Sequence, residues 1–169
     1  MRTTIQKLAE QYQQDLVEIR RHLHAHPELS FHEEKTAAFI SAKLQSFGIE
    51  HQTNIGGHGI VGYIKGKYPE KKTIALRADI DALPIEEKNT CSYTSQNIGV
   101  MHACGHDVHT TCLLGAAKIL QELKDNLEGT IKLIFQPAEE KLPGGASILI
   151  KEGVLENPKV ESIYGQHVL

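Results

Sequence analysis

One short stretch of the chain, residues 101–110, is rich in side chains that bind metal ions. It holds the thiol of Cys104 and the imidazoles of His102, His106 and His109. Zinc-like divalent ions prefer thiolate and imidazole ligands. Gly105 separates Cys104 from His106, and a glycine allows backbone conformations that let both ligands turn toward one point. By itself this spacing is explained equally well by a metal site and by a buried thiol beside a helix cap.

Further potential ligands lie both after and before this stretch in the chain. Glu139, Glu140 and His167 each follow an apolar run typical of a strand. Asp79 and Asp81 also follow such a run, and carboxylates at a strand end are either turn-formers or site residues. Taken together, these residues favour a metal site over a set of unrelated turns and caps.

The elements that must position these residues can be predicted from hydrophobic periodicity. Apolar residues recurring at intervals of three and four predict helices at 4–26, 33–47, 107–123 and 146–152. Short apolar runs bounded by glycine and polar residues predict strands at 49–54, 60–64, 73–78, 131–136 and 162–166. Gly48 should end the second helix, and the glycine cluster at 56–59 should form a hairpin turn.

Strands and helices alternate through the second half, which predicts an α/β domain with a largely parallel sheet and helices on both faces. Ligands bind outside the carboxyl ends of the strands in such sheets. Four of the polar residues lie just beyond predicted strand ends, namely Asp81, Glu139, Glu140 and His167. Cys104 and His106 precede a helix, as residues of a loop at the same edge would. The metal-site hypothesis is therefore preferred.

Two other groups of residues receive structural interpretations. His22, His24 and His26 lie near the end of the first helix, and His22 and His26 are one turn apart. They could chelate a metal, but histidines in a last turn more often complement the helix dipole. Cys112 falls on the apolar face of the 107–123 helix and is expected to be a small core residue.

Composition excludes several classes of function. The 169 residues have a net charge of −3 with acidic and basic residues interspersed, and they contain no tryptophan. No basic face is available for nucleic acid or an anionic membrane, and no apolar run is long enough to span a bilayer. The N-terminus has no signal-peptide core, and three cysteines do not form a disulfide framework. We expect a reduced cytoplasmic protein.

The ligand types indicate a particular chemistry. Cys104, His106, Glu140 and His167, with further ligands, could hold two ions. A close pair of ions lowers the pKa of a water molecule toward ~7 and stabilises a tetrahedral oxyanion. Adjacent glutamates suit a division of labour, in which one binds metal and the other moves the proton from water to the leaving nitrogen. This combination describes hydrolysis of an amide.

The segments 77–84, 101–110, 135–140 and 165–168 resemble, in order, the motifs of the aminoacylase-like metallo-amidohydrolases, and residues 21–31 resemble the start of that family. The resemblance implies a zinc-peptidase-like catalytic domain with two divalent ions, zinc or manganese, and an N-acyl amino acid as substrate. It implies that the metal ligands are Cys104, His106, Glu140 and His167. Glu139 would be the general acid/base and Asp81 would orient a ligand, while Cys104 is the natural candidate to bridge the two ions.

The sequence departs from the family in length. Family members are longer chains, in which a lid and dimerisation domain follows the segment equivalent to 165–168 and the catalytic domain is then completed. Residues 1–169 would therefore form the N-terminal part of the catalytic domain, with little activity alone. Two alternatives remain: a non-catalytic metal-binding module, or an inactive fragment that self-associates through an open sheet edge. We also expect that the protein can form a homo-oligomer.

Overall fold

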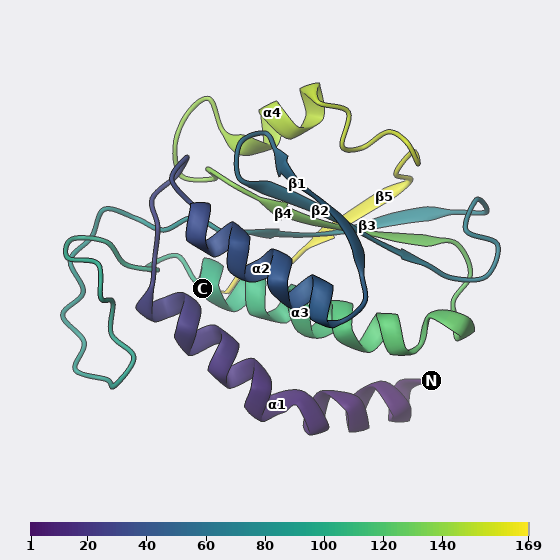
Figure 1. Ribbon diagram of the computed structural model, residues 1–169, viewed down its shortest axis with the longest axis horizontal. Helices are drawn as coiled ribbons and strands as arrows, with labels where there is room; N and C mark the ends of the chain where they lie inside the picture. Colours follow the sequence, from purple (N-terminus) through teal and green to yellow (C-terminus); the bar gives the residue numbers. More distant parts are fainter. Residues whose placement is uncertain (169) are drawn as a thin grey trace.

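The apolar runs of the sequence form one five-stranded sheet, and the periodic segments form the helices that cover it (Figure 1). The computed structural model describes residues 1–168. Its helices are α1 (Arg2–Ala25), α2 (Glu34–Ser46), α3 (His106–Glu122), the short 3-10 helix η1 (Lys124–Asn126) and α4 (Gly145–Lys151). Its strands are β1 (Glu50–Ile55), β2 (Gly59–Lys65), β3 (Thr73–Asp79), β4 (Thr130–Gln136) and β5 (Ser162–Gly165). Every predicted element is present, and only η1 was not anticipated.

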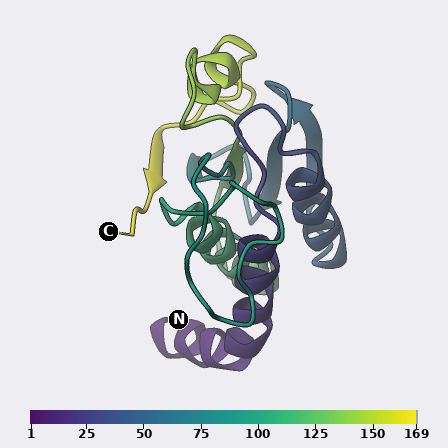
Figure 2. The ribbon, with the colours of Figure 1, turned by 90° about the vertical axis from the view of Figure 1, so that its left-hand side faces the viewer.

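The sheet is mixed, with the strand order β1-β2-β4-β3-β5. Strand β3 pairs in parallel with both β4 and β5, whereas β2 pairs antiparallel with β1 and β4. The α/β class is confirmed, and the parallel part consists of β3, β4 and β5. The carboxyl ends of these three strands meet at one edge, which faces the viewer in Figure 2.

Helices pack against both faces of the sheet. Helices α2 and α3 lie on one face, with α1 packed against the outer side of α3, and α4 lies on the other face (Figure 1). The larger core includes Ile40 and Leu44 of α2, Leu114 of α3 and Phe135 of β4. Strand β4 is buried at every position, since it lies in the middle of the sheet beneath both layers. Burying a side chain the size of leucine or phenylalanine contributes roughly 1.5–3 kcal/mol, so this strand anchors the domain.

Positive φ angles confirm the two glycine predictions. Gly48 follows the last turn of α2 with φ of +69°, a conformation that favours glycine at a helix end. Gly56 and Gly57 have φ angles of +61° and +99° in the turn that joins β1 to β2. The antiparallel pairing of these strands shows that the cluster forms a hairpin. None of the described helices has the length and apolar character needed to cross a membrane.

The prediction that Cys112 is a core residue is wrong. Its side chain is exposed on α3, where it lines a cavity of about 220 Å³ together with Leu76 of β3 and Tyr164 of β5. Helix α3 is buried on most of its circumference, as the consecutive buried residues Leu113 and Leu114 show. Hydrophobic periodicity could not select one buried face on such a helix, and the face with Cys112 borders the edge strand β5.

Lys132 is the most unexpected residue of the core. It lies in the central strand β4 and is only 1% exposed. Its ammonium group donates hydrogen bonds to the carbonyl oxygens of Val154, Glu156 and Pro158 at 2.8, 2.7 and 3.0 Å. Burial lowers the pKa of this ammonium group. The three bonds tie the segment between α4 and β5 to the sheet.

We expect Lys132→Met to lower the free energy of unfolding by roughly 2–4 kcal/mol, because three carbonyls lose their donor while the aliphatic volume is kept. Urea denaturation followed by circular dichroism measures the change. Lys65→Met is the control, since the Lys65 side chain is 57% exposed on β2 and its ion pair with Glu50 contributes at most about 1 kcal/mol. Equal destabilisation by both changes would contradict this role for Lys132.

Candidate metal centre

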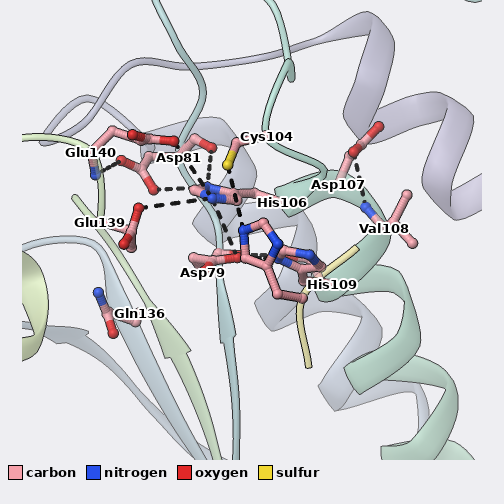
Figure 3. A network of polar contacts seen from close by, with 12 residues as sticks. Asp79, Asp81, Cys104, His106, Asp107, Val108, His109, Gln136, Glu139 and Glu140 are labelled. Atoms are coloured by element: carbon pink, nitrogen blue, oxygen red, sulfur yellow. Dashed lines mark hydrogen bonds and ion pairs between the residues drawn. The ribbon is translucent and has the colours of Figure 1, made fainter. Parts of the chain in front are cut away.

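The predicted site residues converge at the edge where β3, β4 and β5 end (Figure 3). Asp81 follows β3, Glu139 and Glu140 follow β4, and His167 follows β5. His106 is the first residue of α3. Parallel strands bring these segments to one place although they are far apart in the chain. The sheet topology thus explains why the scattered polar residues of the sequence lie together.

The Cys-Gly-His motif forms the turn that opens α3. Gly105 has φ of +79°, and a Cβ atom on it would lie 2.3 Å from the Val168 side chain, so a larger residue does not fit. This turn brings Cys104 and His106 toward one point, as predicted. Donor atoms of Cys104, His106 and His167 all lie within 4.8 Å of one another, and the Cys104 Sγ to His167 Nε2 distance is 3.5 Å.

The His106 ring is held from one side and left free on the other. Its Nδ1 lies 2.9 Å from the carbonyl oxygen of Asp81 and 3.2 Å from Asp81 Oδ1. Its Nε2 is buried and has no hydrogen-bond partner among residues 1–168. This nitrogen lies 3.7 Å from Glu140 Oε1 and 3.9 Å from Glu139 Oε2. A buried, unpartnered nitrogen surrounded by carboxylates fits a cation bound at Nε2.

Asp81 is fully buried and serves as the anchor for this imidazole. Burial alone would raise the pKa of Asp81, but hydrogen bonds from His106 and the Ser30 hydroxyl lower it to about 2. The backbone N–H of Glu140 also donates to this carboxylate, at 3.0 Å. Asp81 is therefore ionised and links the loop after β3 to the loop after β4. The structure thus places Asp81 where its carboxylate can orient His106.

The thiol of Cys104 lies in a strongly negative environment. Burial and the nearby carboxylates of Glu140, Glu139 and Asp79 raise the pKa of Cys104 to about 11. Without a cation the thiol keeps its proton, whereas a bound divalent ion deprotonates a coordinating thiol. The surplus of negative groups around Cys104 and His106 is what a divalent ion would neutralise. The donor set therefore fits a metal of the zinc type.

The two adjacent glutamates both reach the site. Their side chains extend from the turn after β4 toward His106 Nε2, and Glu139 is the more exposed, with 41% of its side chain accessible against 23% for Glu140 (Figure 3). The group formed by His106, Glu139 and Glu140 also has donor atoms within 4.8 Å of one another. Greater exposure of Glu139 agrees with a group that meets water and substrate.

His109 and Asp79 form a second pair behind the site. Asp79 Oδ1 lies 2.6 Å from His109 Nδ1, and Arg77 contacts the other oxygen of Asp79 at 2.7 Å. His109 Nε2 accepts the backbone N–H of Val168 at 3.0 Å. Both nitrogens of His109 are therefore in use, and this residue supports the segment that carries His167. The sequence left Asp79 open as a turn-former or a site residue and indicated no role for His109.

The remaining imidazole of the central stretch, His102, takes no part in these groups. It is buried, and burial lowers the pKa of His102 to about 4, so that it is neutral. Among the described residues neither ring nitrogen has a hydrogen-bond partner. His102 lies next to the Cys-Gly-His motif in the sequence, but nothing in the sequence indicated that it would lie outside the ligand groups that contain His106.

The interpretation of His24 as a helix-dipole residue missed its main contacts. His24 Nδ1 lies 2.7 Å from Asp107 Oδ2, and His24 Nε2 lies 3.0 Å from Glu87 Oε1. The hydrogen bond to Asp107 raises the pKa of His24. Arg20 also contacts Asp107, at 3.0 Å. This buried ion-pair network joins the end of α1 to the start of α3 next to His106.

The other two histidines of that turn fit a packing role. The His22 ring stacks on the rings of His26 and Phe39, with centroids 4.5 and 4.2 Å away. No three-ligand group among the described residues includes either histidine. The described structure therefore gives no support to a metal site formed by His22 and His26 at the end of α1.

The fold and the site define an α/β metal-binding domain of the metallopeptidase kind. The chain belongs to peptidase family M20/M25/M40. The sequence model of that family matches residues 75–169. It is 47% identical over 164 residues to an N-acyl-L-amino acid amidohydrolase of Geobacillus stearothermophilus, covering 97% of this chain and 44% of that protein. It is 48% identical over 155 residues to an N-acetyl-L-cysteine deacetylase of Bacillus subtilis, covering 92% and 36%.

A solved structure is similar over nearly the whole chain. The YXEP protein of Bacillus subtilis, described as a dinuclear metal-binding peptidase of the M20 family, superposes with a TM-score of 0.88 at 41% identity. The match covers 95% of this chain and 44% of that one. The chain thus spans less than half the length of these relatives. The resemblance to metallo-amidohydrolases is confirmed at the level of the family.

We expect Cys104→Ser and His106→Ala each to weaken zinc binding at least about tenfold, because a harder or missing ligand is left at the centre of the site. Elemental analysis after dialysis against a metal buffer gives the bound zinc per chain. Cys91→Ser, in the loop outside the ligand groups, is the matched control and should bind zinc as the unaltered protein does. Full occupancy in both site variants would refute the assignment.

We expect the stabilising effect of His24 to depend on pH. The folded-state pKa of His24 is raised above 6.5, so its contribution is fully present below that pH and is lost as pH rises through the folded-state value. His24→Gln should therefore lower the free energy of unfolding more at about pH 6 than at about pH 9. Urea denaturation without added metal tests this, with the exposed His32→Gln as control. An equal loss at both pH values would contradict the ion pair.

Proposed function

We propose that this chain carries most of the metal site of an enzyme that hydrolyses the amide bond of N-acyl amino acids. The observation that supports it most directly is the geometry around His106 Nε2. This buried nitrogen, which has no hydrogen-bond partner in the described part of the chain, lies between a thiol, an imidazole and two carboxylates, supplied by Cys104, His167, Glu139 and Glu140. This is the donor set of a metallohydrolase, and the family membership of the chain agrees with it.

The proposed roles follow from the contacts of each side chain. Cys104, His106, Glu140 and His167 hold the metal, and Asp81 fixes the tautomer of His106 by accepting the hydrogen bond from Nδ1. A pair of divalent ions bound there would supply Lewis acidity for water and for the scissile carbonyl. Cys104, which faces both His167 and the glutamates, is the candidate bridging ligand.

Glu139 is proposed to carry the proton in this reaction. Its carboxylate is accessible and lies beside the same nitrogen as Glu140, so it can reach a water molecule at the site. As general base it takes the proton from that water, and as general acid it delivers the proton to the leaving nitrogen. The amide C–N bond breaks, and the products are a carboxylic acid and a free amino acid.

The finer parts of the proposal concern the complete protein. We infer two divalent ions, zinc or manganese, and a small N-acyl amino acid substrate, in a cytoplasmic enzyme that can form a homo-oligomer. Relatives named as N-acyl-L-amino acid amidohydrolase and N-acetyl-L-cysteine deacetylase support the substrate class. Residues 1–169 would be the N-terminal part of the catalytic domain, with the lid and the rest of that domain supplied beyond them.

The two alternatives make different predictions for the same protein. A non-catalytic module would bind metal but hydrolyse no amide. An inactive fragment would associate through the outer edge of β5, where Ile163 and Tyr164 are exposed. Metal analysis, amide hydrolysis and gel filtration on one preparation separate these alternatives from the enzyme.

We expect Glu139→Gln and Glu140→Gln to have different consequences in the complete enzyme. Glu139→Gln keeps the shape of the side chain but cannot accept a proton, so the rate of hydrolysis should fall ~10²–10⁴-fold while metal stays bound. Glu140→Gln should lose metal as well as activity. Hydrolysis of hippurate or an N-acetyl amino acid is measured beside zinc content.

Glu152→Gln is a suitable control, because Glu152 lies after α4 and contacts the backbone of Gly56 away from the site. It should retain both zinc and hydrolysis. If Glu139→Gln lost metal and Glu140→Gln kept it, the two roles would be reversed. If neither change reduced hydrolysis, the site would not be catalytic.

A further inference from the structure

One buried carboxylate near the site belongs to none of the ligand groups. Glu33 lies in the loop between α1 and α2, and its side chain is 0% exposed. Burying a carboxylate is costly unless it meets specific partners. Neither the ligand set nor the proposed proton transfer uses Glu33, so its burial needs another explanation.

Glu33 occupies the N-cap position of α2 but does not act as a cap. Its side chain makes no capping hydrogen bond to that helix. Instead, Glu33 Oε1 accepts the backbone N–H of Ala138 at 2.7 Å, across 105 residues of sequence. The simple explanation, a helix cap that happens to be buried, is therefore excluded by its contacts.

Ala138 is the residue on which the two glutamates of the site depend. It is fully buried and has φ of +48°, in the left-handed region that alanine rarely adopts. Its carbonyl oxygen accepts the N–H of Gly145 at 2.8 Å. With Glu33 on the N–H side, both polar groups of Ala138 are fixed. The left-handed residue sets the direction in which the chain leaves β4 and carries Glu139 and Glu140 to the site.

The same loop also holds the opposite side of the site. Ser30 donates its hydroxyl to Asp81 at 2.6 Å, and the Ala82 N–H donates to the carbonyl oxygen of Glu28 at 2.8 Å. Burial raises the pKa of Glu33, the nearby charge of Asp81 raises it further, and the backbone N–H of Ala138 opposes both effects. The loop before α2 thus contacts Asp81, which anchors His106, and also the segment that carries Glu139 and Glu140.

We propose that Glu33 is a positioning residue, which holds Ala138 in its left-handed conformation so that Glu139 and Glu140 face the metal centre. The proposal rests on the proposed function for the roles of those two glutamates. In this role Glu33 acts as a hydrogen-bond acceptor. The carboxylate oxygen that accepts the N–H of Ala138 is required, and the negative charge of the side chain is secondary.

The experiment compares three variants in the complete, metal-loaded enzyme. Glu33→Met keeps similar volume and removes the acceptor, whereas Glu33→Gln keeps an oxygen that can accept the same N–H. Glu34→Met is the matched control, since Glu34 is the next residue and is exposed. Zinc dissociation constants, kcat and KM for an N-acetyl amino acid, and the visible spectrum of the cobalt-substituted enzyme are measured for each.

For Glu33→Met we expect kcat to fall about 10–100-fold with little change in KM, and zinc affinity to fall about tenfold. The cobalt spectrum should change because Glu140 is displaced. Glu33→Gln should stay within about threefold of the unaltered enzyme. Glu34→Met should match the unaltered enzyme in all measurements.

Wild-type kcat, zinc affinity and cobalt spectrum in folded Glu33→Met would overturn the proposal. So would equal losses in Glu33→Gln and Glu33→Met, since the charge would then matter and not the acceptor. If Glu33→Met does not fold, Glu33→Asp, with its carboxylate drawn back from Ala138, must show the same losses. If the unaltered enzyme hydrolyses no amide, the proposed function fails, while zinc affinity and the cobalt spectrum still decide the role of Glu33.

Discussion

The contact between Asp81 and the Nδ1 of His106 is the constraint on which the site depends. By occupying one ring nitrogen, Asp81 fixes the orientation of the imidazole and leaves Nε2 directed at the carboxylates. An ionised, fully buried Asp81 is stable only because several donors reach it. The donors to its carboxylate come from the loop before α2, from α3 and from the turn after β4. The buried carboxylate of Asp81 therefore joins three segments of the chain, and their positions together determine where His106 Nε2 points.

Electrostatic repulsion explains why this edge of the sheet needs a cation. Asp79, Glu139 and Glu140 lie close to the Cys104 thiol and to the buried imidazole of His106. In a medium of low polarizability such a cluster is unfavourable unless positive charge neutralises it. The protein provides part of that charge through Arg77, which pairs with Asp79. The remaining negative groups face the point where the ligand atoms meet, so metal binding and local stability are linked.

The chain supports the centre from behind with a second layer of buried polar pairs. His109 with Asp79, and His24 with Asp107, join the start of α3 to β3 and to α1. Buried charge pairs of this kind contribute little to net stability, but they fix orientation, because breaking one leaves an unpaired buried group. Rigid placement of α3 matters here, since its first residue is His106. The supporting residues Asp79, His24 and His109 thus lie on strand β3 and on helices α1 and α3, directly behind the start of α3.

The sequence by itself determined the elements, the α/β class and the ligand candidates. Periodicity located each helix and strand within two residues, since local hydrophobic pattern reflects which face of an element is buried. Residue chemistry and order selected Cys104, His106, Glu140 and His167 as candidate ligands, and the sheet rule predicted that they share an edge. Tertiary structure alone decided which long-range partners each polar group meets. The contact of Glu33 with Ala138, the three bonds of Lys132 and the exposure of Cys112 depend on how elements pack, and no local pattern encodes that packing.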